Sequence, residues 1–290
     1  MQKLLIFLTC AVFLTTPALA SQWNEIQFGA SAAVGESQSG PWSDDFSRTT
    51  YGLGYTIYLP GLDSDDYDYG YSYDVPQPRR LKPFLQHPSH INASYFSWEY
   101  DWDDSADTDG TETSLGGKYY TPTEEWATGF GVSYSKDEDD WKSIRFSVDQ
   151  YIEQVFNIEI SLDSAEDGAW EADTTTITGR AFLFDILWTS LSYAQSESEW
   201  MGKSNYDEDR TGFEIGLYPG SIYSVILNYQ KRDRDYTGGG SREQTYISLS
   251  NNFWFTDSFA METELFSRKR EWTGGDQEYA GLALDFIIRF

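Results

Sequence analysis

Apolar and polar residues alternate along most of the chain between Glu25 and Phe290. Because successive side chains of a β-strand point to opposite faces of a sheet, this pattern predicts strands with one apolar and one polar face. Most of the alternating segments are about ten residues long, which is the length that a tilted strand needs to cross a lipid bilayer. The last segment shows the pattern clearly, with apolar side chains at Ala280, Leu282, Leu284, Phe286, Ile288 and Phe290.

These segments predict an all-β protein, a transmembrane antiparallel up-and-down β-barrel of about 14 strands. An even number of strands returns both ends of the chain to the periplasmic side. A barrel of about 12 strands is the alternative, because the two faces are poorly resolved in 91–102, 112–120 and 174–184. The expected strands lie near residues 25–35, 49–59, 91–102, 112–120, 125–136, 141–150, 154–163, 174–184, 187–196, 210–218, 222–231, 244–255, 259–268 and 279–290.

The segments between these strands fall into two classes. One class is short and turn-like, as in residues 218–221, and the other is longer and charged, as in 197–210, 231–243 and 268–278. Short turns at one rim and long loops at the other are typical of outer-membrane barrels. The connector 60–90 breaks this rule, because it is long and falls on the short-turn, periplasmic side. It is either a flexible excursion or a segment that folds into the lumen as a partial plug.

The first twenty residues have the pattern of a secretory signal peptide. Lys3 supplies a positive charge, an apolar run covers residues 4–14, and Ala18-Leu19-Ala20 forms a small-x-small cleavage site. We therefore expect a signal peptide at residues 1–20 and a barrel at residues 21–290. A lipoprotein signal is the weaker alternative, since Thr9 precedes Cys10 where a small apolar residue is required.

Composition excludes several classes of protein. Cys10 is the only cysteine, so the chain after residue 20 can hold no disulfide, cysteine-based zinc site or thiolate nucleophile. The net charge of −27 becomes −28 without Lys3, which argues against a nucleic-acid partner. No uncharged apolar stretch of about 18 residues follows the signal, so no transmembrane helix is predicted.

The last strand resembles the C-terminal assembly signal of bacterial outer-membrane proteins, which ends in Phe and carries apolar residues at alternate positions upstream. The matching residues are Leu282, Leu284, Phe286, Ile288 and Phe290. The resemblance covers about ten residues and implies insertion by the barrel assembly machinery of a Gram-negative cell. It places the chain in the cell outer membrane, in contact with lipid and lipopolysaccharide.

A second segment, Leu81-Lys82-Pro83-Phe84-Leu85-Gln86-His87-Pro88-Ser89-His90-Ile91-Asn92-Ala93-Ser94-Tyr95, is similar to the stretch before the third strand in porin-like proteins of marine gammaproteobacteria. It departs from them by lacking a Glu-Ala-Ala sequence before the Phe-Leu pair. This similarity supports placement in a porin-like family, but it does not indicate which solute would be transported.

Catalytic chemistry finds little support in the sequence. The two histidines, His87 and His90, both fall in the connector 60–90, and Pro88 lies between them where a metal-binding helical turn would need regular backbone. We therefore expect solvated linker histidines, no enzyme activity, no metal and no cofactor.

The polar faces of the strands supply the candidate functional residues, because in a barrel of this size they face a water-filled lumen. An excess of carboxylates there predicts a preference for cations, and Asp285 with Arg289 is expected to form an opposite-charge pair near the periplasmic mouth. The predicted pore-lining residues are Glu25, Arg145, Asp149, Glu159, Glu214, Glu262, Glu264, Asp285 and Arg289, with Lys118 and Arg180 as further candidates.

The function that the sequence favours is a porin-like channel for passive diffusion of small hydrophilic solutes, with cation preference. One alternative is a closed structural or docking barrel that binds a partner through acidic loops or the connector 60–90. Another is a saccharide-specific channel, since the chain holds 11 Trp and 21 Tyr residues whose rings can stack on sugars. The solute, and the choice between monomer and trimer, stay open.

Overall fold

The computed structural model describes most of the predicted barrel. The signal-peptide prediction for residues 1–20 and most of the connector 60–90 lie outside the described residues. Those residues are 23–40, 42–59, 81, 84, 88–103, 106–122, 126–138, 140–152, 155–201 and 203–290.

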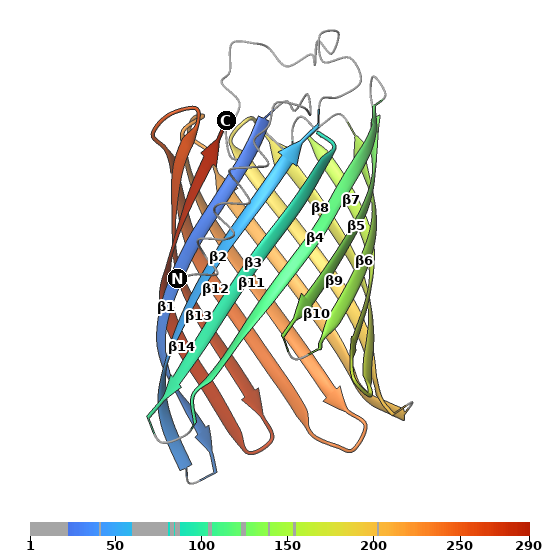
Figure 1. Cartoon of the computed structure of the whole chain (residues 1–290), viewed down its shortest axis with the longest axis vertical. Helices are drawn as coiled ribbons and strands as arrows, with labels where there is room; N and C mark the ends of the chain where they lie inside the picture. Colours follow the sequence, from blue (N-terminus) through green and yellow to red (C-terminus); the bar gives the residue numbers. More distant parts are fainter. Residues whose placement is uncertain are drawn as a thin grey trace.

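Within these ranges, fourteen antiparallel strands form a closed barrel (Figure 1). Each strand pairs with its neighbours in the chain, and the first strand pairs with the last. The strands are β1 (Trp23–Ser39), β2 (Trp42–Tyr58), β3 (His90–Trp102), β4 (Thr108–Pro122), β5 (Trp126–Asp137), β6 (Lys142–Ile152), β7 (Phe156–Asp167), β8 (Trp170–Leu183), β9 (Leu187–Trp200), β10 (Lys203–Leu217), β11 (Tyr223–Tyr236), β12 (Ser241–Trp254), β13 (Phe259–Trp272) and β14 (Gly275–Arg289).

The all-β, up-and-down barrel of 14 strands is thus confirmed, and the alternative of 12 strands is wrong. The three segments with poorly resolved faces form β3, β4 and β8. In β8, Arg180 and Phe182 share the inward face, so a charged and an aromatic side chain both face the lumen there. No helix in the described ranges is long and apolar enough to span a bilayer.

The two faces of the wall follow from the pairing register, because directly opposite residues of antiparallel strands lie on the same face. Phe28 lies opposite Phe286, and their rings stack outside the barrel with centroids 5.0 Å apart. The outward apolar residues together form the apolar belt. Its most exposed members include Phe130, Val132, Phe146, Val148, Ile158, Ile160, Leu162, Ile177, Leu191, Phe213, Leu227, Leu249, Leu265, Leu282 and Leu284.

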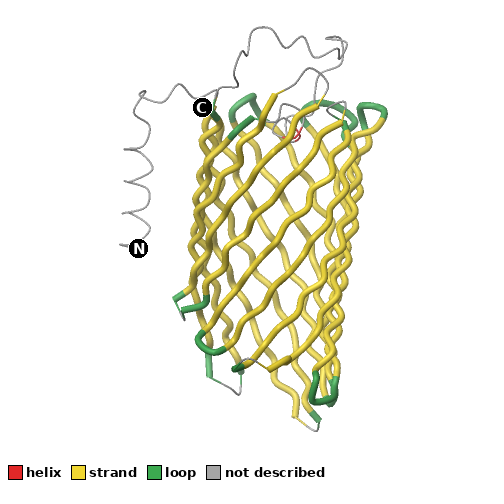
Figure 2. The backbone as a smooth tube through the Cα atoms, turned by 90° about the vertical axis from the view of Figure 1, so that its right-hand side faces the viewer, coloured by secondary structure: helices red, strands yellow, loops and turns green. Residues whose placement is uncertain are grey.

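The barrel has two different rims. At the terminal rim, the upper one in Figures 1 and 2, β1 begins and β14 leads to Phe290. At the opposite, hairpin rim, two to five residues separate the paired strands, and left-handed backbone at Gly168 (φ 59°) and Gly274 (φ 102°) closes two of these connections. The connections at the hairpin rim are residues 40–41, 103–107, 138–141, 168–169, 201–202, 237–240 and 273–274.

The prediction of long charged loops at one rim is therefore wrong. Residues 203–210, 231–236 and 268–272 belong to strands that continue well past the apolar belt. The strands are 11 to 17 residues long, instead of the predicted ten or so. The physical reason is that both faces carry polar or charged residues there, with arginine and aromatic side chains at most inward positions and charged side chains at the outward ones, so hydrophobicity no longer marks a strand. Figure 2 shows these long strands running along the barrel wall at a tilt to the barrel axis.

Candidate functional site

All nine predicted pore-lining residues occupy inward positions of the register. Glu25 lies opposite Arg289, Asp149 opposite Glu159, and Glu262 opposite Asp285. The structure thus brings several of the predicted charges together as neighbours on the inner wall, on adjacent strands. What each charge can contribute to the lumen depends on the partners that it finds there.

Glu25 and Arg289 form an ion pair across the seam between the first and last strands. The Arg289 Nε lies 2.7 Å from the Glu25 Oε2, and its guanidinium lies 4.3 Å from the centre of the Trp254 ring. The sequence predicted Asp285 as the opposite charge for Arg289. The structure pairs Arg289 with Glu25, because barrel closure places these two residues directly opposite each other.

Two further groups of predicted residues also neutralise each other along the wall. The Lys118 Nζ lies 3.4 Å from Asp149 Oδ2 and 2.9 Å from Glu159 Oε2, and Arg180 Nη1 lies 3.3 Å from the same Glu159 oxygen. Arg145 forms an ion pair with Asp163 on the adjacent strand. Lateral pairing of this kind cancels charge locally and leaves little field across the lumen.

The remaining predicted carboxylates lie on β10, β13 and β14, in the half of the barrel next to the terminal rim. Glu264 accepts a hydrogen bond of 2.6 Å from the Tyr246 hydroxyl, and Glu214 accepts one from the Trp188 indole. Asn252 donates to Glu262 over 3.5 Å. These hydrogen bonds from neutral donors orient Glu214 and Glu264 without cancelling their negative charge.

The sequence missed a larger set of inward charges in the half next to the hairpin rim. Every one of the ten arginines in the described ranges occupies an inward position, whereas Lys136, Lys142, Lys231 and Lys269 point outward. Most of the missed arginines fall in the segments that the sequence predicts as charged loops, 197–210, 231–243 and 268–278. A usable signal was present, because arginine recurs at every second position in two of these segments, within 231–236 and 268–272. The seven inward arginines that the sequence prediction missed are Arg48, Arg210, Arg232, Arg234, Arg242, Arg268 and Arg270.

Three of these arginines surround one buried carboxylate, that of Glu208. Arg210 contacts it from the same strand, Arg232 Nε lies 3.3 Å from its Oε1, and Arg234 Nη2 lies 2.6 Å from its Oε2. The Glu208 side chain is fully buried. Arg234 also lies over the Tyr206 ring at 3.8 Å. This Glu208 cluster fixes the relative position of β10 and β11 beyond the apolar belt.

Aromatic residues line the lumen near the terminal rim, and two residues of the long connector pack against them. Leu81 is buried in a cluster with Phe182, Trp188, Tyr218 and Ile226. Phe84, three residues further along the connector, packs against the same wall. The centre of its ring lies 4.7 Å from that of Trp188. Both anchors therefore lie inside the barrel mouth.

The histidine prediction needs a correction. His90 is not a solvated linker residue, because it begins β3, faces inward and is half-buried with its ring 5.7 Å from that of Tyr58. Its Nδ1 lies 3.1 Å from the carbonyl oxygen of Pro88. His87 lies outside the described residues. In the part of the chain that is described, no group of three or more His, Cys, Asp or Glu residues could hold a metal ion.

No model of a protein family matches the sequence, and no curated protein matches it. Solved structures do match. An outer-membrane channel from Pseudomonas putida F1 has a TM-score of 0.54 at 9% identity, covering 95% of this chain and 97% of that chain. Omp33 from Acinetobacter baumannii has a TM-score of 0.48 at 13% identity, covering 92% and 99%. OmpT from Vibrio cholerae has a TM-score of 0.49 at 8% identity, covering 92% and 98%.

The chain has the fold of an outer-membrane β-barrel. The Pseudomonas channel and this chain share the architecture over nearly their whole lengths. The apolar belt independently supplies the surface that such a fold presents to lipid.

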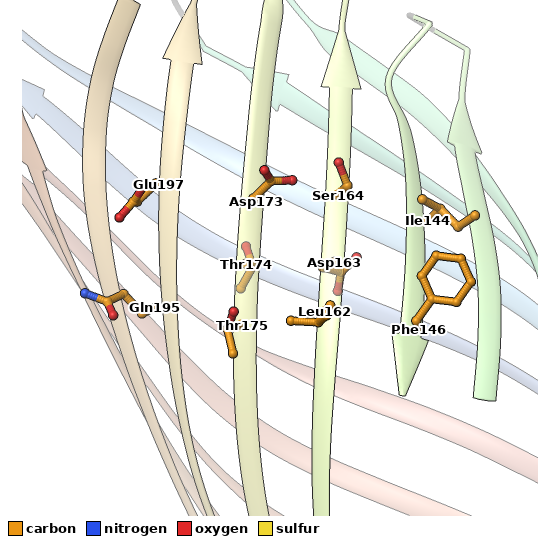
Figure 3. Close-up of a pocket in the computed structure, with 10 residues that line it drawn as sticks. All are labelled: Ile144, Phe146, Leu162, Asp163, Ser164, Asp173, Thr174, Thr175, Gln195 and Glu197. Carbon is orange, nitrogen blue, oxygen red and sulfur yellow. The ribbon is translucent and has the colours of Figure 1, made fainter. Parts of the chain in front are cut away.

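The outer surface of this outer-membrane barrel changes character along each strand. Figure 3 shows a hollow across β6 to β9 where apolar Phe146 and Leu162 give way to Asp173 and Glu197. The exposed, outward carboxylates between this level and the hairpin rim form the acidic collar. Its members include Asp173, Glu197, Asp209, Asp233, Glu243, Glu271 and Glu278. Among the described residues, negative charge is therefore concentrated on the outer surface, on the part of the wall that extends beyond the belt.

The inner wall of the outer-membrane barrel also has one side with small residues. A cavity of about 330 Å³ lies against β14, β1, β2 and β3. Its lining includes Gly29, Gly52 and Gly54. A Cβ atom added at Gly52 would have its nearest neighbour 3.5 Å away, and one at Gly54 would have it 3.9 Å away. Side chains therefore do not fill the lumen on this side, which we call the glycine lane.

Proposed function

We propose that this barrel is a channel for passive diffusion of small hydrophilic solutes across the outer membrane, with its terminal rim facing the periplasm. The observation that carries the proposal is the glycine lane, since it leaves free space beside polar side chains at mid-height of the wall. The inward charges beside it suit water and hydrophilic solutes rather than lipid.

The hairpin rim supports the same conclusion. Its longest connection, residues 103–107, is too short to fold down into the barrel and constrict it. At the hairpin rim the side chains of the wall therefore set the width of the passage, and at the terminal rim the connector residues Leu81 and Phe84 narrow it further.

Recording from single channels in planar bilayers tests the proposal, and liposome swelling with small sugars extends it to uncharged solutes. We expect discrete conductance steps and swelling that slows as the sugar grows. A purified, folded barrel that gives neither steps nor swelling would contradict the channel and favour a closed docking barrel.

The glycine lane gives a sharper test. Gly54→Trp should lower the single-channel conductance, because the indole ring enters the cavity while the backbone there accepts a Cβ atom without a clash. Leu53→Trp is the matched control, since it adds the same ring to the outward face of the same strand. Equal conductance of the two variants would show that ions do not pass along the glycine lane.

We further propose that the channel prefers cations. Support comes from Glu214 and Glu264, which lie within the membrane-spanning half and accept hydrogen bonds from neutral donors, and from Glu262, which shares their inward face. Changing Glu262 and Glu264 together to lysine should move the reversal potential in a salt gradient toward anion preference. The control variant Glu271→Lys with Glu278→Lys changes the total charge equally, but on the outward acidic collar. A reversal potential that moves equally in both variants would contradict a role for the two inward carboxylates.

A further inference from the structure

A second cavity lies inside the mouth at the hairpin rim and is separate from the glycine lane. Its volume is about 440 Å³, and its lining combines two arginines with hydroxyl, amide and aromatic side chains. Among the residues that the structure describes, no carboxylate belongs to this lining. The lining residues are Ser37, Tyr236, Gly239, Gly240, Ser241, Arg242, Arg270, Trp272, Thr273 and Gln277.

The two arginines in this cavity have neutral neighbours. Arg270 donates to the amide oxygen of Gln277 over 3.3 Å and to that of Gln244 over 3.3 Å and 3.4 Å. Arg242 interacts with the Tyr236 hydroxyl. No ion pair with a carboxylate forms at Arg242 or Arg270 in the described ranges.

The positive charge at this mouth is also reinforced by a third arginine. Arg268 lies over the rings of Tyr246 and Tyr279, at 5.3 Å and 5.7 Å from their centres, and its charge and that of Arg242 act on Arg270. Acidic residues on the same strands cannot neutralise the cavity from within, because the register points Glu271 and Glu278 outward. The Glu208 cluster shows the contrast, since its three arginines share a buried carboxylate.

Like charges held close together without a counter-charge are unfavourable, and an anion in the cavity would relieve that repulsion. The planar guanidinium group binds carboxylate or phosphate through two parallel hydrogen bonds. The hydroxyls of Ser37, Ser241 and Thr273 add donors at the same site, and the Trp272 ring adds an apolar face. The chemistry of this lining therefore matches a small solute with one or more oxyanion groups.

We propose that Arg242 and Arg270 form a binding site for small oxyanions, carboxylate or phosphate, at the hairpin-rim mouth of the barrel. The site lies on the inward face, between the hairpin rim and the level of the apolar belt. The carboxylates of the membrane-spanning half lie further along the lumen, toward the terminal rim. It goes beyond the channel proposal and does not depend on it, because an anion can bind at the mouth of an open or a closed barrel.

Isothermal titration of the purified, detergent-solubilised full chain tests the site directly, with inorganic pyrophosphate and citrate as separate probes at low ionic strength and without divalent cations. We expect saturable binding of at least one probe. Binding of both probes would show that the site accepts oxyanions in general. Binding of pyrophosphate alone would show a preference for phosphate, and binding of citrate alone a preference for carboxylate. Absence of saturable binding with both probes overturns the proposal.

The variant Arg242→Ala with Arg270→Ala should weaken binding about tenfold or more, since it removes two charge-assisted partners. Lys269→Ala is the matched control, because it removes one positive charge from the outward face beside Arg270. The milder variant Arg242→Lys with Arg270→Lys keeps both charges and loses the forked geometry, so it should bind with intermediate affinity. Unchanged affinity in either double variant, with folding verified by heat-modifiable gel mobility, would overturn the assignment to these two arginines.

Discussion

Replacing Glu208 with alanine should lower the free energy of unfolding of the barrel by about 3 kcal/mol. The change removes the fully buried carboxylate that Arg210, Arg232 and Arg234 share and leaves three guanidinium groups facing one another. Breaking a buried ion pair typically costs about 3–5 kcal/mol. We expect the lower end of that range, because the arginine side chains stay partly exposed and water can screen them.

Denaturant-induced unfolding of the barrel in lipid vesicles measures this loss. Asp207→Ala is the control, since it removes the exposed, outward carboxylate of the residue next to Glu208 in β10. Its free energy of unfolding should stay within about 0.5 kcal/mol of that of the parent chain. Adding Arg232→Ala to Glu208→Ala should restore part of the stability, because it relieves repulsion between the remaining arginines. A Glu208→Ala barrel as stable as the Asp207→Ala barrel would refute a stabilising role for the cluster.

Replacing Leu284 with arginine should destabilise the barrel in a bilayer by about 2–4 kcal/mol, the penalty for a cationic side chain at mid-depth on the lipid face. Leu284 points outward between Ala30 and Thr263, near the middle of the apolar stretch of β14. The penalty arises because the charged group must leave water for hydrocarbon or distort the lipid around it.

Ala283→Arg is the matched control, because the neighbouring residue faces the lumen beside the glycine lane, where the guanidinium can stay hydrated. Unfolding of both variants in vesicles of the same lipid provides the comparison. An Ala283→Arg barrel that loses as much stability as Leu284→Arg would contradict the assignment of the lipid and lumen faces.

The sequence predicted the fold where apolar residues mark one face of a strand. β14 is the clearest case, since Leu282, Leu284 and Phe286 fix its outward face and a register shift of one residue would bury them in the lumen. The strand count followed from the same pattern. The prediction failed where both faces are polar, as in residues 231–236, because hydrophobicity no longer separates the faces and charged stretches look like loops.

The ion pairs could not be predicted from local sequence. Arg289 and Glu25 are 264 residues apart and meet only because the barrel closes. The anchoring of Leu81 against Phe182 and Trp188 is equally a product of the tertiary fold. The arginines of the hairpin half were within reach of sequence reasoning, because Arg232 and Arg234 already alternate with acidic neighbours at the period of a strand.

The short turns of the hairpin rim have a consequence for how this protein can vary. In most barrels the outer loops accumulate substitutions and insertions freely, because their backbone is not paired with other strands. Here the wall continues as paired strands almost to its edge. If the hairpin rim faces the exterior, as we propose, antibodies or phages that reach this surface would meet the acidic collar rather than interchangeable loops. A substitution that prevents their binding would then have to fall on a residue within paired strands.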